Sequence, residues 1–296
     1  MRKVHLLPNL LTLANAFCGL LAICKGIDAL ALSDGGGTFY AKMEAACWLV
    51  FLGMAFDAVD GKVARMVGGS SNFGAQLDSF SDMLTFGVAP AVLAKVLIEH
   101  EGPLYDYPVH ARLNFIAAAV FSLMAILRLA RFNLENDPDP AAHKSFKGLP
   151  SPGAAGMIAA TMLMYLSLKN PDIEFSDGSP TPLGALLRLV PWIHASPFLY
   201  WFLPALVLLL PACGLLMVSR VRYTHMFSWI TGRGQFVTLV TVVVAAVLLF
   251  TAPPLSMFLV FTGYVFFGLV RSLFPQHAAA PRTPASGPTP PPVVPR

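Results

Sequence analysis

Four aspartates and an arginine lie close together in one short stretch of the chain, in the order Asp57, Asp60, Arg65, Asp78 and Asp82. A helix turns by about 100° per residue, so the first two aspartates share one helical face and the last two share a face of the next helix. Two helices that each present a pair of carboxylates form a cage of oxygen atoms. Because Mg²⁺ and Mn²⁺ prefer oxygen ligands and commonly sit against substrate phosphates, the spacing predicts a divalent-metal site.

Phosphoryl-type transfer is the chemistry that such a site favours, since it depends on positioning and on charge stabilisation by metals and arginine. Two metals about 4 Å apart can contact both the attacking and the leaving oxygen, and four aspartates can hold such a pair. Arg65 can place a planar guanidinium on a phosphate. Gly61, Ala64 and Gly74 lack bulk, which lets a nucleotide approach closely.

The elements that must position these residues are membrane helices. The chain has 296 residues, of which 56% are hydrophobic and 12% charged, whereas soluble domains carry about 25% charged residues. About 20 apolar residues in a row span a bilayer. We predict an all-α, polytopic membrane helix bundle with about eight transmembrane helices. The expected spans are residues 7–25, 41–60, 76–97, 113–131, 152–168, 198–218, 236–252 and 255–273.

Basic residues gather on one side of this predicted topology, which identifies that side as cytoplasmic. The aspartate stretch then faces the cytoplasm, at the edge of the cell's inner (plasma) membrane, where carboxylates are costly and are expected to be functional. The net charge of +4 indicates no nucleic-acid partner, because the basic residues are spread over membrane-flanking loops. We predict a transmembrane domain over residues 1–274 and a disordered, Pro- and Ala-rich cytoplasmic tail over residues 275–296.

The gapped pattern DxxDGxxAR from Asp57, followed by Gly74, Asp78 and Asp82, resembles the signature of the CDP-alcohol phosphatidyltransferases, with every fixed position met. Members of that family transfer a phosphatidyl or related group from a CDP-linked donor to an alcohol and release CMP. The resemblance implies that all four aspartates bind Mg²⁺ or Mn²⁺ and that Asp82 also takes the proton from the acceptor hydroxyl. The residues that it implies for contact with the donor are Gly61, Ala64, Arg65 and Gly74.

The flanking segments are similar to the branch of this family that transfers the phosphatidyl group of CDP-diacylglycerol to L-serine. This similarity is carried by residues 7–12, 73–79, 86–90, 128–133 and 146–152. Arg128 and Arg131, at the inner end of the fourth predicted span, can each form a forked bond to the serine carboxylate, and Asn133 can add polar contacts. The alternative is that the two arginines bind lipid headgroups. The resemblance also suggests a homodimer in the membrane lipid.

Two other functions remain open at this stage. The same chemistry with glycerol 3-phosphate or an inositol derivative as acceptor cannot be separated on physical grounds. An ion-coupled transporter would also use intramembrane carboxylates, although these tend to lie near the bilayer midplane. Asn9 and Thr12 in the first span can contact the nucleotide or cap the start of a helix, and we favour the cap.

Overall fold

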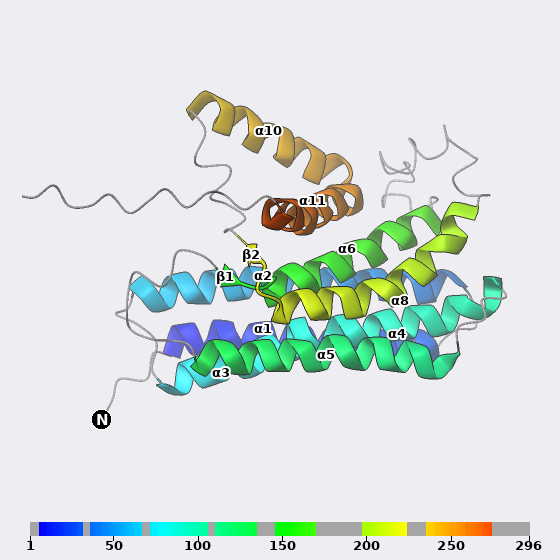
Figure 1. The fold of residues 1–296 in the computed structure, drawn as a ribbon, viewed down its shortest axis with the longest axis horizontal. Helices are drawn as coiled ribbons and strands as arrows, with labels where there is room; N and C mark the ends of the chain where they lie inside the picture. Colours follow the sequence, from blue (N-terminus) through cyan, green and yellow to red (C-terminus); the bar gives the residue numbers. More distant parts are fainter. Residues whose placement is uncertain are drawn as a thin grey trace, which may run out of the picture.

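The computed structural model describes residues 6–31, 36–66, 72–105, 110–134, 146–169, 197–223 and 235–273. Helices make up almost all of these residues (Figure 1). The predicted tail over residues 275–296 lies outside the described residues. The α-helices are α1 (Leu6–Ala31), α2 (Gly36–Met66), α3 (Asn72–Asp82), α4 (Ala89–Glu101), α5 (Ala111–Leu134), α6 (Ser151–Lys169), α8 (Pro197–Val218), α10 (Gln235–Thr251) and α11 (Pro253–Leu273).

Seven helical segments in the described part of the chain are long and apolar enough to cross a membrane. The all-α bundle with about eight spans is therefore confirmed, with α10, at 17 residues, as the shorter eighth helix. The expected break between the last two spans is also present, because α10 ends at Thr251 and α11 begins at Pro253. Proline is tolerated in the first turn of a helix, where its missing N–H is not needed.

The third span is longer than predicted, running over Asn72–Leu104 instead of residues 76–97. The span consists of four helical pieces in a row. Helix α3 continues into a π-helix, η1 (Met83–Val88), then into α4, and a 3₁₀ turn, η2 (Gly102–Tyr105), follows α4. The π-helix begins directly after Asp82. Turns of this kind occur frequently at functional sites.

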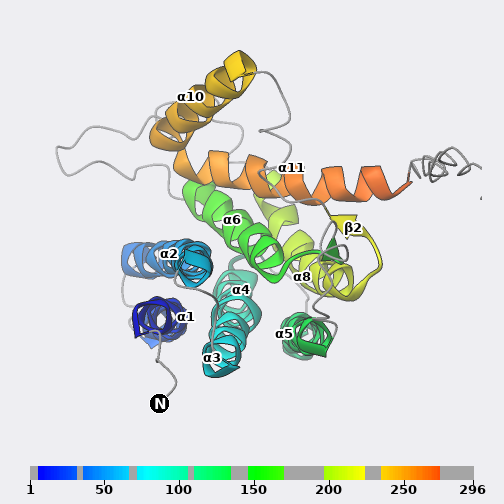
Figure 2. The same cartoon turned by 90° about the vertical axis from the view of Figure 1, so that its left-hand side faces the viewer.

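Helix α6 lies at the centre of the bundle, surrounded by α2, α4, α8 and α11 (Figure 2). Small residues on α6 let the neighbouring helices pack closely around it. A Cβ atom added at Gly156 would overlap the ring of Phe261, and one added at Gly153 would lie 3.0 Å from Tyr264. Glycine therefore lets α11 cross α6 closely, as small residues do in membrane helix pairs.

A buried carboxylate, Glu101, joins three helices at one end of the bundle. It is fully buried and accepts hydrogen bonds from Tyr40 of α2 at 2.8 Å and from Tyr165 of α6 at 2.5 Å. The ammonium group of Lys169 lies 3.3 Å from the same carboxylate. At about 1.5 Å per residue, Glu101 lies about 30 Å along the third span from Asp82. This network therefore stabilises the end of the bundle opposite to the aspartates.

A two-stranded ribbon closes the aspartate end. Strand β1 (Phe146–Lys147) pairs antiparallel with β2 (Arg222–Tyr223) and so ties the chain before α6 to the chain after α8. Gly148 follows β1 with a φ of 88°, a conformation that glycine adopts without steric cost. Its N–H donates to the Val221 carbonyl at 2.7 Å.

Candidate functional site

Three of the four predicted aspartates come together between α2 and α3. Asp57 and Asp60 lie near the end of α2, and Asp78 lies on α3. One carboxylate oxygen from each residue lies within 4.8 Å of the other two. Asp60 is buried, whereas Asp57 and Asp78 are half-buried. Three of the four carboxylates of the predicted two-helix arrangement therefore lie together.

This three-carboxylate group, Asp57, Asp60 and Asp78, fits a divalent cation. Its three like charges lie close together, and no lysine or arginine among the described residues forms an ion pair with them. Repulsion between neighbouring carboxylates disfavours this arrangement unless protons or a cation neutralise it. The donors are all carboxylate oxygens, which Mg²⁺ and Mn²⁺ prefer. The group can therefore hold a divalent metal.

Asp82 stands beside the three-carboxylate group without being part of it. Its Oδ1 accepts a hydrogen bond from Nδ2 of Asn15 on α1, at 3.2 Å. The charges of all three aspartates of the group act on Asp82, and the charge of Asp82 acts on Arg128 of α5. Asp82 thus occupies a different position from the other three acids, and it also interacts electrostatically with a buried cation.

The residues expected to contact the donor lie on α2 and α3, the two helices that carry the aspartates. Gly61 is exposed, and a Cβ atom added there would have no neighbour within 4 Å. Arg65 is exposed in the last turn of α2. Ala64 and Gly74 are half-buried, on α2 and α3 respectively. Arg65 and Gly61 therefore offer an accessible surface next to the carboxylates.

Arg128 is the buried cation of the site. It is only 9% exposed, and its Nη1 donates to Oγ of the fully buried Ser151 at 2.7 Å. Its Nε is buried and has no hydrogen-bond partner among the described residues. Buried donors are usually paired, so an unpaired guanidinium N–H facing the interior indicates a place for an acceptor group.

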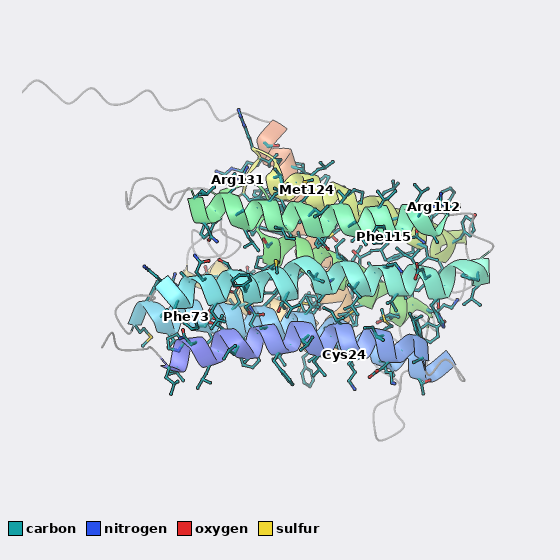
Figure 3. The ribbon with its side chains drawn as sticks, turned by 90° about the horizontal axis from the view of Figure 1, so that it is seen from below. Cys24, Phe73, Arg112, Phe115, Met124 and Arg131 are labelled. Carbon is teal, nitrogen blue, oxygen red and sulfur yellow. The ribbon has the colours of Figure 1, made fainter. Side chains whose placement is uncertain are left out.

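Arg131 and Asn133 lie at the same end of α5 and bridge it to other helices. Nη1 of Arg131 donates to the Val218 carbonyl of α8 at 3.0 Å, while Asn133 donates to Ser79 of α3 at 3.1 Å. Figure 3 shows Arg131 at the end of the bundle that also carries Phe73. The structure thus brings all three residues predicted for serine to the aspartate end, although only Arg128 is buried there.

Two residues of the site, Asn15 and Ser151, were missed in the sequence, and Thr12 was considered only as a nucleotide contact or a helix cap. Thr12 donates to Asp60 at 2.8 Å, Asn15 donates to Asp82, and Ser151 accepts from Arg128. The cap interpretation of Thr12 is wrong, because α1 begins at Leu6 and Thr12 lies inside the helix. For Thr12 and Asn15 the available signal was their spacing of three residues along an apolar helix, since polar residues that are buried face a partner.

Taken together, the fold and the site define an integral membrane protein with an acidic centre that can bind a divalent cation at one end of its helix bundle. This is the class of membrane-embedded enzymes that work on phosphate-containing substrates, for which carboxylate-held metals supply charge stabilisation.

Comparison with known proteins identifies the family. A model of the CDP-alcohol phosphatidyltransferase family matches residues 5–196. The CDP-diacylglycerol–serine O-phosphatidyltransferase of Helicobacter pylori (strain ATCC 700392 / 26695) is 30% identical over 276 residues, covering 92% of each chain. The protein of the same name from Bacillus subtilis (strain 168) is 32% identical over 162 residues, or 55% of this chain and 78% of that one. The chain belongs to the CDP-alcohol phosphatidyltransferase family.

A third relative, the archaetidylserine synthase of Methanothermobacter thermautotrophicus, is 34% identical over 190 residues, which are 57% of this chain and 70% of that one. The family implies a CDP-linked donor and an alcohol acceptor, and its members work in membrane lipid. Membership therefore favours a transferase over the ion-coupled transporter considered from the sequence.

Proposed function

We propose that this protein transfers the phosphatidyl group of CDP-diacylglycerol to the hydroxyl of L-serine and releases CMP. The observation that carries the proposal is one buried arginine, Arg128, which interacts electrostatically with Asp82 at the end of the bundle that holds the three-carboxylate group. A phosphate-handling centre with a buried cation beside it suits an alcohol that carries a carboxylate. Serine is such an alcohol, and the names of the relatives agree with it.

Asp57, Asp60 and Asp78, with Asp82 as a further ligand, would hold Mg²⁺ or Mn²⁺. The bound cation would neutralise the charge of the donor diphosphate. Arg65 is accessible beside them and would bind a phosphate oxygen through its planar guanidinium. The cytidine portion of the donor would lie against the helices and contact Gly61, Ala64 and Gly74, because these residues have little bulk.

Asp82 would act as the general base. The serine hydroxyl oxygen forms a bond to the phosphorus of the phosphatidyl group, and the bond from that phosphorus to the oxygen of CMP breaks. The hydroxyl proton passes to Asp82, and CMP leaves with the bonding electrons. Two observations support this role: Asp82 lies outside the three-carboxylate group, and its charge acts on Arg128.

Arg128 would bind the serine carboxylate through its Nε, which is buried and has no partner among the described residues. A hydrogen bond between two charged groups is stronger than a neutral one. Asn133, held to α3 by Ser79, and Arg131, held to α8, would line the approach to this position. The bonds that Asn133 makes with Ser79 leave its amide a further N–H donor for a ligand.

The site would face the cytoplasm from the cell's inner membrane. This orientation follows from the excess of Lys and Arg in the loops on the aspartate side. The transmembrane unit would extend over residues 1–274, with residues 275–296 as a disordered tail, and the enzyme would work as a homodimer. Serine and CMP would then exchange with the cytosol, while the lipid substrate and product stay in the membrane.

A panel of acceptor alcohols tests the proposal. Purified protein with CDP-diacylglycerol and Mg²⁺ or Mn²⁺ is given serine, glycerol 3-phosphate, inositol, inositol phosphate or choline, and CMP release is measured. We expect release with serine well above that with the other alcohols. Release driven by a different alcohol would retain the family chemistry and reject serine, and no release with any alcohol would reject the proposed function.

A further inference from the structure

Two polar side chains, Thr12 and Asn15, interrupt the buried face of α1. They are 4% and 0% exposed, and they lie three residues apart, so they are neighbours on one helical face. The rest of that face consists of small or apolar residues: Pro8, Cys18, Gly19, Ala22, Gly26 and Ala29. A buried polar side chain is costly unless it has a partner. The partners of these two residues therefore indicate why they are there.

Each of the two side chains binds one aspartate of the site, and the two aspartates come from different helices. Thr12 Oγ1 lies 2.8 Å from Oδ2 of Asp60, and Nδ2 of Asn15 lies 3.2 Å from Oδ1 of Asp82. The Thr12 hydroxyl also lies 3.1 Å from the Pro8 carbonyl. The carboxylate is the closer acceptor and, when ionised, the stronger one. Helix α1 thus supports one acid within the three-carboxylate group and the one acid outside it.

The backbone of α1 is fixed at the same two residues. Ser81 Oγ donates to the Thr12 carbonyl at 2.8 Å, and Thr85 Oγ1 donates to the Asn15 carbonyl at 2.9 Å. Ser81 directly precedes Asp82, and Thr85 lies in the π-helix that follows it. The segment that carries Asp82 is therefore attached to α1 on both sides of this aspartate. These bonds fix the register of the two helices.

The surrounding packing leaves the Asn15 side chain little freedom. A Cβ atom added at Gly53 of α2 would lie 2.9 Å from Oδ1 of Asn15, and one added at Gly19 would lie 2.5 Å from Oγ1 of Thr85. Glycine at these positions allows α1, α2 and η1 to meet. The Oδ1 atom of Asn15 is buried without a hydrogen-bond partner among the described residues. The polar contact of this side chain is thus the bond that it donates to Asp82.

We propose that Asn15 is a positioning residue for Asp82, and that Thr12 has the same role for Asp60. This inference rests on the proposed function, in which Asp82 takes the proton from the acceptor hydroxyl. A carboxylate held by a fixed N–H keeps one oxygen engaged and presents the other to the substrate. Helix α1, which lies outside the gapped pattern from Asp57 to Asp82, then sets the orientation of the base and of one metal ligand.

The Asn15→Leu variant tests the first part, because leucine is similar in volume and lacks the N–H donor. We expect kcat to fall by about tenfold to hundredfold, the range typical of groups that orient a metal ligand or its neighbours. The KM for CDP-diacylglycerol should not change. The affinity for Mn²⁺, measured by electron paramagnetic resonance of the free ion, should fall much less than kcat, because Asp82 is one of four carboxylates that would hold the metal. A matched control is Asn114→Leu, another buried asparagine with an unpaired Oδ1. It lies about 20 Å along α5 from Arg128.

The Thr12→Val variant tests the second part with a different expected pattern. Valine keeps the shape of threonine and loses the hydroxyl that binds Asp60. We expect the Mn²⁺ affinity in the same resonance assay to fall by about tenfold or more. The Thr12→Ser variant keeps the hydroxyl and should keep the wild-type affinity for Mn²⁺. A purely structural role would lower the folded fraction in both variants without separating kcat from Mn²⁺ affinity.

Wild-type kcat in Asn15→Leu would overturn the positioning role of Asn15, and so would an equal loss in Asn114→Leu. Asn15→Ala, which adds no branched side chain beside Gly53, is measured in parallel. Loss of folded protein in both Asn15 variants would also overturn the proposal, because it would assign Asn15 to stability. The wild-type protein separates this test from the proposed function. If it releases CMP only with another alcohol, the serine assignment fails, and the variants are compared with that alcohol instead.

Discussion

Arg128 and Ser151 form a buried hydrogen bond of 2.7 Å that holds one nitrogen of the guanidinium in the interior of the bundle. The Nε atom of the same group has no partner among the described residues. Arg131, one helical turn further along α5, instead donates to the Val218 carbonyl. The two arginines, which the sequence could not separate, therefore have different surroundings.

The Arg128→Ala variant should lose serine recognition more than donor recognition. Removing a charge-assisted bond to the serine carboxylate should cost roughly 1.5–3 kcal/mol, or about tenfold to hundredfold in the apparent KM for serine. The apparent KM for CDP-diacylglycerol should change much less. Arg131→Ala is the matched comparison, with a smaller effect on serine. Equal losses for both substrates in Arg128→Ala would indicate a lipid-headgroup anchor, and no loss for either would place the serine carboxylate elsewhere.

The Asp82→Asn variant should bind the donor and fail in turnover. If Asp82 accepts the proton of the serine hydroxyl, the amide should lower kcat by about 10² to 10⁴. The control is Asp28→Asn. Asp28 is exposed and lies near the end of α1, far from Asn15 and the site. Steady-state CMP release gives kcat, and binding of CDP-diacylglycerol gives the donor affinity. Wild-type turnover in Asp82→Asn would mean that another group is the base.

Replacement of Arg65 by lysine should weaken donor binding, although the charge is kept. Lysine is a point charge and cannot form the planar, forked contact that a phosphate accepts from arginine. We expect a higher apparent KM for CDP-diacylglycerol, measured in mixed micelles of constant lipid fraction. The control is Arg112→Lys, which should have no effect. Arg112 lies at the end of α5 opposite to Arg131, away from the aspartates (Figure 3). A normal KM in Arg65→Lys would assign Arg65 to structure or topology.

The buried Glu101 network should contribute to stability and not to chemistry. Glu101→Gln weakens the bonds from Tyr40, Tyr165 and Lys169 at a fully buried position. Hydrogen bonds to a charged group contribute about 1.5–3 kcal/mol, so Tm in detergent should fall clearly. Glu99→Gln is the control, because its pair with Lys95 is about one-third exposed and should contribute little. A lower kcat at unchanged Tm would contradict this assignment.

Much of the fold follows from local features of the sequence. Apolar run length predicted the spans, and Pro253 predicted the break between α10 and α11, because proline restricts only its own backbone and its neighbours. The start of the third span was misplaced, since α3 is polar enough around Asp78 to resemble a loop. The π-helix after Asp82 had no sequence signal that we recognised.

The candidate site was predictable where its residues follow helical spacing. Asp57 and Asp60 share a face of α2, and Asp78 joins them from α3, as the spacing indicated. The bond between Asn15 and Asp82 joins residues far apart in the chain. Contacts of that kind depend on how α1 packs against η1, which local periodicity does not determine. The same holds for Ser151, whose partner Arg128 lies on another helix.

The central claim is the transfer of a phosphatidyl group to serine, and the most direct measurement is the stoichiometry of that transfer. Purified protein is incubated with CDP-diacylglycerol, isotopically labelled serine and Mn²⁺, and both CMP and labelled lipid are quantified. We predict one serine incorporated into lipid for each CMP released, and neither product when excess chelator removes the metal. CMP release without incorporation of serine, or full activity in chelator, would contradict the proposed function.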